Sequence, residues 1–265
     1  MNKGKVGIVV QARMGSTRLP GKVLMQINNK PLLQRLVDRL KRAKAVDTIV
    51  LATSIDPLDN PIEELCSRLE IPCIRGSLDD VLDRYYQAAT SAQLDTVVRI
   101  TADCPLMDPS LIDQMVQHFQ RGQHDYLANT APPEGSSFPD GMDVEIFSMS
   151  ALTRAWKEAQ KPSEREHVTF YFWKNPTLFR TFRHDAANNL SSYRLTVDYL
   201  EDIEVVRAIF KHFGEERINF DMKEILEFLD THPQIRKINS AVAPNLGWQS
   251  ALKKDVALVE GKGSI

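Results

Sequence analysis

The sequence lacks a long hydrophobic run, and this absence argues against a membrane-spanning helix. The longest apolar runs, Val6–Val10 and Ile49–Ala52, have the length of buried strands, whereas a membrane span needs about 18 apolar residues. The first five residues, MNKGK, contain neither the apolar core nor the small-residue cleavage site of a secretory signal. We therefore expect a cytoplasmic protein without membrane insertion.

Cysteine is scarce as well, which argues against a disulfide framework or a cysteine-based metal site. Cys66, Cys73 and Cys104 cannot all pair with one another, and none of them forms a Cys-x-x-Cys motif. Cys104 adjoins Asp103 but has no evident partner base. The three thiols are typical of buried side chains in a reducing compartment.

Neither sign of charge predominates. The chain has 33 lysines and arginines against 35 aspartates and glutamates, which leaves a net charge of −2. This balance argues against a protein that wraps nucleic acid, so we expect no nucleic-acid partner. At about 150 residues per domain, 265 residues allow one large domain or two small ones. Either possibility provides a core without disulfides or metal staples.

Strand and helix patterns alternate through the first 121 residues. Short β-branched runs predict strands at Lys5–Gln11, Asp47–Thr53, Pro72–Arg75 and Asp95–Thr101. Amphipathic spacing predicts helices from Pro31 and over Pro61–Glu70, Leu78–Ala92 and Pro109–Arg121. Such alternation predicts an α/β fold with three layers, α/β/α, around a mostly parallel mixed sheet. Ligands bind beyond the carboxyl ends of such strands, so the loops after Gln11 and Thr101 are the expected site.

The later part of the chain gives weaker signals. A turn-rich excursion over 131–140 precedes a predicted strand at Met142–Phe147, and later patterns predict helices near Ser150–Gln160 and Glu164–Trp173, a strand at Tyr193–Val197 and a helix over Leu200–Phe213. No linker or repeat divides the chain, so we expect one domain over 1–238. Residues 239–265 carry mixed signals and predict a C-terminal arm that is partly disordered.

Glycine and positive charge are concentrated in the loop directly after the first predicted strand. Residues 11–22, QARMGSTRLPGK, contain two glycines and three cations: Gly15, Gly21, Arg13, Arg18 and Lys22. Glycines let backbone N–H groups approach an anion, and the cationic side chains suit polyphosphate oxygens. The loop differs from a Walker A motif, because five residues separate its glycines and Val23 replaces the Ser or Thr. We favour a polyphosphate site over a plain basic surface loop.

Two aspartates follow predicted strands. Asp103 comes just after Asp95–Thr101, and Asp198 ends the run 194–198. Polyphosphate transfer needs a divalent cation, and two carboxylates at strand ends can converge on one Mg²⁺. Each aspartate also has a structural alternative, since Asp198 and Glu201 have capping-box spacing and Asp103 could form a turn. With the cationic loop nearby, we favour the role of metal ligand for both.

Five further segments complete a pattern that resembles the cytidylyltransferase family, which includes the CMP-Kdo and CMP-sialic acid synthetases. The segments are RGSLDDVLDRYY at 75–86, RITADCPL at 99–106, GMDVE at 141–145, EREHV at 164–168 and RLTVD at 194–198. The pattern is most similar to the branch of the spore coat polysaccharide protein SpsF. The resemblance implies a nucleotide-diphospho-sugar-transferase-like domain, often dimeric, that converts CTP and a sugar to a CMP-sugar and pyrophosphate.

The resemblance also implies roles for individual residues. Asp103 matches the aspartate of the Gly-Asp-Glu-Pro motif in CMP-Kdo synthetases, and Asp198 matches their second metal-binding aspartate. Ala102 and Cys104 depart from that motif, so the nucleotide contacts at this turn are expected to differ. The expected catalytic residues are Arg13, Lys22, Asp103 and Asp198. The expected nucleotide-binding residues are Gln11, Ala12, Arg13, Gly15, Ser16, Arg18, Lys22, Ser77, Asp80, Arg84 and Ala102.

Three of these nucleotide-binding residues lie in a segment similar to the family's base-recognition stretch, Ser-Gly-Thr-Asp-Arg. They are Ser77, Asp80 and Arg84. A polar edge and a rigid guanidinium suit the edge of a cytosine. The alternative is a surface helix pair, because Asp80 and Arg84 are four residues apart.

Acceptor-binding residues are expected in two places. Asp143 and Glu145 alternate along a predicted strand and would hold sugar hydroxyls, unless they are solvated carboxylates of an edge strand. Arg165 and His167 would bind an acidic or phosphorylated acceptor, unless they lie on a solvated helix face.

The sequence therefore predicts a Mg²⁺-dependent nucleotidyltransferase that activates a sugar or sugar acid with CTP for surface polysaccharide biosynthesis, as a homodimer. One alternative is a glycosyltransferase that uses a sugar nucleotide. Such enzymes usually carry an Asp-x-Asp motif after a strand, and no convincing one occurs here. The other alternative is a nucleotide-binding scaffold without turnover, against which the intact Lys22, Asp103 and Asp198 argue.

Overall fold

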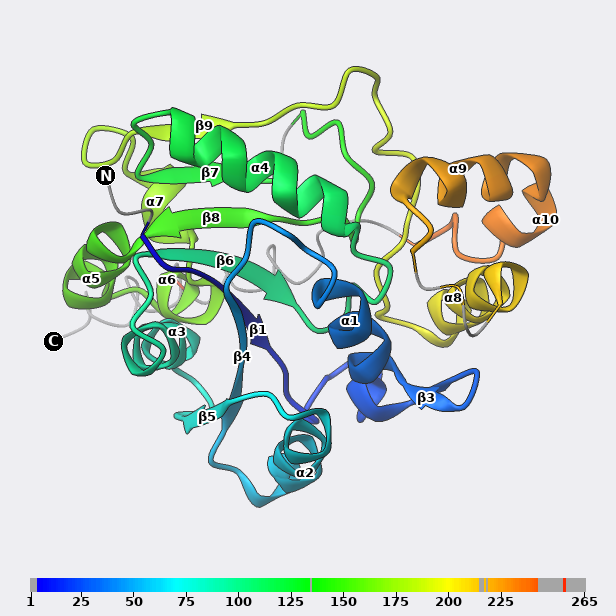
Figure 1. The fold of residues 1–265 in the computed structure, drawn as a ribbon, viewed down its shortest axis with the longest axis horizontal. Coiled ribbons are helices and arrows are strands. Elements are labelled where there is room, and N and C mark those ends of the chain that lie inside the picture. Colours follow the sequence, from blue (N-terminus) through cyan, green and yellow to red (C-terminus); the bar gives the residue numbers. More distant parts are fainter. Residues whose placement is uncertain (1–3, 134, 215–216, 218, 243–254, 256–265) are drawn as a thin grey trace, which may run out of the picture.

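The four strands that the alternating strand–helix pattern predicts are present, and they are parallel neighbours in one sheet. The computed structural model describes residues 4–133, 135–214, 217, 219–242 and 255. In its seven-stranded sheet, β5 (Cys73–Gly76), β4 (Thr48–Ser54), β1 (Val6–Gln11) and β6 (Thr96–Thr101) are adjacent in this order (Figure 1). Gln11 is paired with Ala52 on one side and with Thr101 on the other, so the carboxyl ends of the three central strands are level.

The rest of the sheet is mixed. β8 (Glu145–Ser148) is antiparallel to both β6 and β7 (Tyr126–Ala128), and β9 (Thr181–Arg183) is parallel to β7 at the edge. The predicted three-layer architecture with a mostly parallel mixed sheet is thereby confirmed. β7 and β9 are absent from the prediction, because a strand of three residues is too short to show an alternating pattern.

Alternating strand residues bury against two different helix layers. Ile8 and Val98 face one apolar cluster, and Val9 and Val97 face the other. The first cluster includes residues of α1 (Leu32–Leu40), α2 (Asn60–Leu69), α4 (Pro109–Arg121), α8 (Leu200–Phe213) and α9 (Met222–Thr231). The second includes residues of α3 (Val81–Ser91), α5 (Met149–Glu158) and α7 (Phe170–Lys174), and the short α6 (Pro162–His167) contacts α3.

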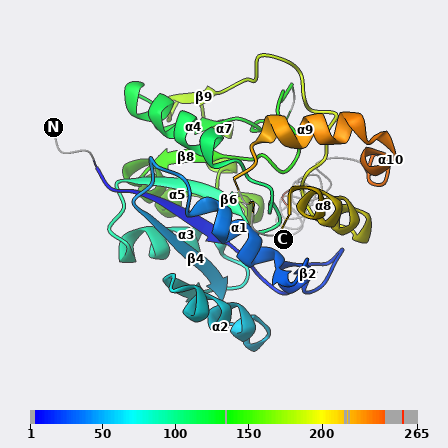
Figure 2. The same cartoon turned by 45° about the vertical axis from the view of Figure 1, so that its right-hand side comes forward.

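Smaller elements lie outside the sheet. Lys22–Leu24 and Pro57–Asp59 form single 3₁₀ turns, and β2 (Gln26–Ile27) pairs with β3 (Lys30–Pro31). α8, α9 and α10 (Pro233–Arg236) gather on the side toward which β1 and β6 point (Figures 1 and 2). No helix in the described ranges is long and apolar enough to cross a membrane.

The predicted strand at Tyr193–Val197 is wrong. Among the described residues, this segment makes a single β-bridge, between Asp140 and Arg194. Its N–H groups are divided between two loops, since Leu195 and Thr196 donate to the carbonyl of Asp140 whereas Val197 donates to that of Asp103. Thr196 and Val197 are buried, but the segment connects the loops at Asp140 and Asp103 instead of extending the sheet.

Two other boundaries differ from the prediction. β8 begins three residues later than the predicted strand because the Asn129 side chain bonds the carbonyl of Met142 and the N–H of Val144 in place of a neighbouring strand. The predicted helix Glu164–Trp173 is divided into α6 and α7 at Val168, whose φ of 57° is incompatible with a helix.

The predicted C-terminal arm over 239–265 lies mostly outside the described residues. Of its described members, Asn239 is buried, and Asp255 accepts hydrogen bonds from the backbone and hydroxyl of Ser163 at the start of α6. The excursion at 131–140, described except for residue 134, contains no helix or strand among its described residues.

Candidate active site

The cationic loop is a closed turn at the carboxyl end of β1. The N–H of Ala12 donates to the carbonyl of Ala52 and continues the β1–β4 pairing. Gly21 then donates to the carbonyl of Met14 at 2.9 Å and closes the loop. Gly21 has a φ of 72°, a conformation that glycine adopts without a steric penalty. A single 3₁₀ turn follows and directs Lys22 back toward the sheet.

A buried carboxylate outside the loop holds it in place. Asp59 is 2% exposed and accepts from the N–H of Met14 at 2.7 Å and from the N–H and hydroxyl of Ser54. Sequence reasoning missed Asp59, because an aspartate before a helix has the ordinary signature of a cap. Its contacts identify it as a positioning residue for the loop.

Lys22 lies between the two predicted metal ligands. Its Nζ is 2.8 Å from Asp103 Oδ2 and 2.9 Å from Asp198 Oδ1, and it also donates to the carbonyl of Val197. Arg18 lies 2.5 Å from the same oxygen of Asp198. Burial alone would lower the pKa of Lys22, but the two carboxylates raise it above its usual value. Although burial opposes it, the Lys22 ammonium lowers the pKa of Asp103 to about 2.

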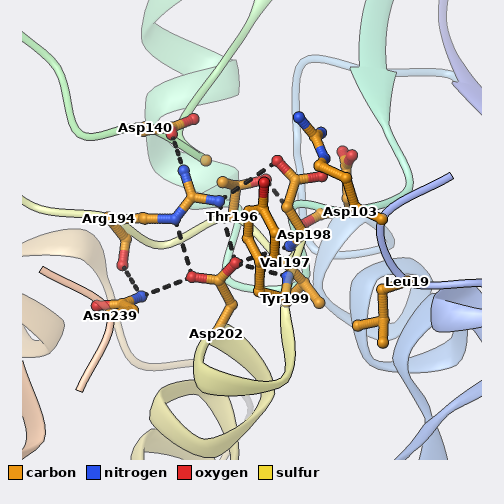
Figure 3. Close-up of polar contacts among 12 residues, drawn as sticks. Leu19, Asp103, Asp140, Arg194, Thr196, Val197, Asp198, Tyr199, Asp202 and Asn239 are labelled. Carbon is orange, nitrogen blue, oxygen red and sulfur yellow. Dashed lines mark hydrogen bonds and ion pairs between the residues drawn. The ribbon is translucent and has the colours of Figure 1, made fainter. Parts of the chain in front are cut away.

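A third cation, Arg194, contacts the other carboxylate oxygen of Asp198 (Figure 3). Arg194 donates to Asp140 at 2.6 Å, to Asp198 at 3.3 Å and to Asp202 at 2.9 Å. Asp202 has no exposed side-chain surface and accepts from the N–H groups of Asp198 and Tyr199 and from Asn239. The carboxylate that caps α8 is therefore Asp202. The capping alternative for Asp198 is wrong, and its side chain faces Lys22.

Asp103 occupies a turn that joins two segments of the site. The Cys104 N–H donates to the carbonyl of Thr101, and the Asp103 carbonyl accepts from the N–H of Val197. The turn alternative thus describes the backbone of Asp103, while its carboxylate contacts Lys22. Burial raises the pKa of the Cys104 thiol well above its usual value, which makes this residue a poor nucleophile.

Asp80, Arg84 and Arg165 lie together on the other face of the sheet. Asp80 caps α3 through the N–H of Asp83 and pairs with Arg165, whose Nε lies 3.0 Å from each carboxylate oxygen. Asp80, which the sequence assigns to the nucleotide, is thus paired with Arg165, which the sequence assigns to the acceptor. Arg84 is 2% exposed and makes no ion pair with Asp80, so the surface-pair alternative is wrong.

The guanidinium of Arg84 is buried with polar atoms left unsatisfied. Its Nε and Nη1 have no hydrogen-bond partner among the described residues. Burial, together with the nearby charge of Arg13, lowers its pKa. A buried donor without an acceptor is costly, so this position suits an acceptor group of a ligand.

Three other predicted nucleotide-binding residues make local hydrogen bonds with the backbone, two of them at the cationic loop and Ser77 at the start of α3. Ser16 Oγ accepts from the N–H of Leu19, Ser77 Oγ accepts from that of Asp80, and the N–H of Ala102 donates to the carbonyl of Gln11. A Cβ added at Gly15 would meet nothing within 4 Å, so open space adjoins the loop there.

The predicted acceptor residues do not form one group. Asp143 precedes β8 and accepts from the N–H of Gly141, while Glu145 begins β8 and pairs in the interior with Arg99 and Tyr126. His167 stacks on Phe170 at 4.6 Å between ring centroids. Asp143 therefore lies toward the Asp140 side of the site, and Arg165 with His167 lies beside α3.

Comparisons with known proteins agree on one family. A family model described as cytidylyltransferase matches residues 7–228. An uncharacterized protein of Methanocaldococcus jannaschii, MJ1063, is 40% identical over 236 residues, 88% of this chain and 94% of the relative. The spore coat polysaccharide biosynthesis protein SpsF of Bacillus subtilis is 34% identical over 234 residues, 85% of this chain and 94% of that protein.

A third relative and a solved structure have similar coverage. The 8-amino-3,8-dideoxy-manno-octulosonate cytidylyltransferase of Shewanella frigidimarina is 33% identical over 249 residues, 90% of this chain and 99% of that enzyme. A cytidylyltransferase structure from Leptospira borgpetersenii superposes with a TM-score of 0.84 at 33% identity and covers 92% of this chain and 100% of its own. The chain therefore belongs to the cytidylyltransferase family of nucleotidyltransferases.

Proposed function

We propose that the protein transfers the cytidylyl group of CTP to a sugar or sugar acid and releases pyrophosphate, with Mg²⁺ as the cofactor. The observation that carries this proposal is the Lys22 ammonium, held between Asp103 and Asp198 directly beside the cationic loop. The alternating charges of this arrangement are complementary to those of a metal–triphosphate complex. The relatives' names support CTP as the nucleotide and polysaccharide biosynthesis as the setting.

The two carboxylates fit a magnesium ion. Mg²⁺ is usually bound through one or two carboxylates, substrate phosphates and several waters. The Lys22 ammonium lies between Asp103 and Asp198, so positive charge is stabilised at this point. For a metal to take this place, the ammonium would move toward the phosphates that it is proposed to bind. These two residues would hold the metal. When bound, Mg²⁺ neutralises charge on phosphate oxygens.

The cationic side chains provide the remaining chemistry. Arg13, Arg18 and Lys22 would bind the triphosphate and stabilise the charge that develops on the departing pyrophosphate. An acceptor oxygen attacks the α-phosphorus, and the bond from that phosphorus to the oxygen bridging to the β-phosphate breaks. Reactions of this kind depend mainly on positioning and electrostatics. Asp59, through its bond to Met14, would fix the loop during this step.

The acceptor is a sugar or sugar acid in this proposal. The octulosonate named in the Shewanella enzyme is a sugar acid, and Arg165 and His167 would suit such an acidic group. Asp143 would bind hydroxyls from the opposite side of the site. We also propose a homodimer, in line with the resemblance described above.

Pyrophosphate release tests the proposal. The protein is incubated with CTP, Mg²⁺ and a panel of sugars, sugar phosphates and sugar acids, in parallel with UTP, ATP and GTP. We expect release with CTP and one acceptor class, and loss of at least a hundredfold in Asp103→Asn. Lys41→Ala is the matched control, because the Lys41 ammonium is exposed and, in the part of the chain that the structure describes, donates only to the carbonyl of Leu69. Release with another nucleotide in place of CTP, or full activity in Asp103→Asn, would refute the assignment.

A further inference from the structure

A buried ion pair joins the two halves of the sheet. Arg99 on β6 and Glu145 on β8 are register partners and form a salt bridge, with 9% and 2% of their surfaces exposed. Glu145 also accepts from the Tyr126 hydroxyl, and the Arg99 guanidinium lies over the Tyr85 ring. Buried ion pairs contribute little stability relative to apolar pairs of similar volume. Stability alone therefore does not account for this pair.

The ion pair ends at the cationic loop. Arg99 Nη2 donates to Gln11 Oε1 at 3.1 Å, and Gln11 is the last residue of β1. A guanidinium only donates hydrogen bonds, so the atom that it contacts must be the amide oxygen. The amide NH₂ of Gln11 is consequently turned away from Arg99. Nε2 has no hydrogen-bond acceptor among the residues that the structure describes.

Gln11 lies across the sheet from the Lys22 cluster. Val9 and Val97, two residues before Gln11 and Arg99, pack in the apolar cluster of α3, whereas Val10 and Val23 pack in the other cluster. Side chains two residues apart on a strand share a face, so Gln11 is on the α3 face. The cationic loop begins at Gln11, so a nucleoside that lies on the α3 face beside this loop would meet the Gln11 side chain. Arg84, with its unsatisfied nitrogens, belongs to the same helix.

We propose that the side-chain amide of Gln11 reads the pyrimidine of the nucleotide, and that Arg99 and Glu145 are positioning residues that fix its orientation. This inference rests on the proposed cytidylyl transfer. Cytosine and uracil both carry an acceptor at O2, but only cytosine has an acceptor at N3, so an NH₂ donor aimed at N3 is complementary to cytosine. Uracil carries a hydrogen on N3, so the same NH₂ would face another donor. An amide held in one orientation thus favours CTP over UTP.

Reversing the hydrogen-bonding character of this residue tests the inference. Gln11→Glu preserves the shape and the contact with Arg99 but replaces the donor with an acceptor. We expect the ratio of CTP to UTP affinity, measured by titration calorimetry with Mg²⁺, to fall at least tenfold. An unchanged ratio would overturn the inference. Equal loss of both nucleotides would also overturn it, and would assign Gln11 to a part of the nucleotide that CTP and UTP share.

A matched control and a positioning variant complete the test. Gln123→Glu is the control, because Gln123 Oε1 accepts from Arg180 in the same way at an exposed position, and its ratio should not change. Folded Glu145→Gln should lower the ratio through loss of orientation, an effect that a purely structural role would not produce. Wild-type protein that binds neither CTP nor UTP would refute the proposed function itself. Wild-type preference for CTP that survives in Gln11→Glu would refute only the role of Gln11.

Discussion

At Lys22, one buried ammonium neutralises two carboxylates that would otherwise face each other in a poorly hydrated place. Loss of one partner of a buried ion pair typically costs about 3–5 kcal/mol. The lower end applies here, because Asp198 keeps Arg18 and Arg194, whereas Asp103 loses the one cation that pairs with it among the described residues. Lys22 therefore contributes to folding as well as to the proposed chemistry. Without a cation between them, the negative charges of Asp103 and Asp198 would destabilise the fold.

Lys22→Ala should accordingly lower the free energy of unfolding by about 3 kcal/mol. Millimolar Mg²⁺ should restore part of that loss, since a divalent cation replaces the missing charge between Asp103 and Asp198. Urea denaturation with and without Mg²⁺ measures both effects, with Lys41→Ala as the control. A variant whose stability does not respond to Mg²⁺ would contradict the assignment of these aspartates as metal ligands.

Asp202 makes the stability of the fold depend on pH. Burial would raise the pKa of this carboxyl, but hydrogen bonds from Arg194, Asn239 and the backbone lower it below its ordinary value of 3.8. A group with a depressed pKa stabilises the fold above its ordinary pKa, and this contribution is lost as the pH falls through the depressed value.

In Asp202→Asn we therefore expect a stability deficit of about 2 kcal/mol at neutral pH, the usual cost of losing hydrogen bonds to a charged group. The deficit should shrink as the pH falls below about 4, where wild type loses the same contribution. Unfolding free energies from pH 7 to pH 2.5 measure this difference. The exposed Asp79→Asn serves as the control, and a deficit that stays constant down to the lowest pH would argue against the assignment.

The site residues that could be predicted from the sequence differ from those that could not in how their positions are determined. Lys22 and Asp103 could be predicted to converge because they lie in the loops that follow β1 and β6 at the same edge of the sheet. Asp198 is predicted there from a strand that does not form, and hydrogen bonds to the loops at Asp140 and Asp103 hold its segment in place. Asp59, Arg194 and Asp202 act through contacts between segments distant in the chain, and each has the local signature of a cap or an exposed charge. The pairing of Arg99 with Glu145 required the antiparallel register of β8, which no local pattern specifies.

At the level of elements, the irregular segment 193–198 is held by backbone hydrogen bonds to neighbouring loops, as a strand is held by its neighbours in a sheet. Its backbone is held by the loops at Asp140 and Asp103, and it approaches Gly141 closely. A Cβ at Gly141 would lie 2.3 Å from the backbone nitrogen of Thr196, and the φ of this glycine is 99°. Only glycine fits that approach.

Gly141→Ala should therefore displace the segment that carries Asp198. We expect a loss of at least 2 kcal/mol in unfolding free energy, since backbone strain alone costs about 1–3 kcal/mol. Thermal unfolding of Gly141→Ala measures this loss. Gly15→Ala is the control, because a methyl group at that position meets no neighbouring atom within 4 Å. Equal melting temperatures for the two variants would show that the close approach at Gly141 is not required.

Prediction of elements succeeded where runs were long. β1, β4 and β6 and the helices α1 to α4 agree with the sequence pattern to within a few residues, because each has a clear period of burial. β7 and β9 are too short for such a period, and the hydrogen bonds of residues 193–197 depend on tertiary neighbours. Local periodicity carries no information of that kind.

For the molecule as a whole, the predicted architecture, family and enzyme class are confirmed. The family assignment favours the transferase over the non-catalytic scaffold, and the same edge of the sheet brings together the loop, Lys22 and both aspartates. Magnesium, the acceptor and the homodimer stay predictions. The central claim is that this edge binds CTP through a metal held by the aspartates.

Thermal unfolding with each nucleoside triphosphate, with and without Mg²⁺, tests that claim most directly. A ligand at 100 times its Kd stabilises the fold by about 2.7 kcal/mol, which is a readily measured shift. We predict a shift with CTP that requires Mg²⁺ and is lost in Asp198→Asn. A shift that appears only with finished sugar nucleotides, or one that is equal in Asp198→Asn, would contradict the account.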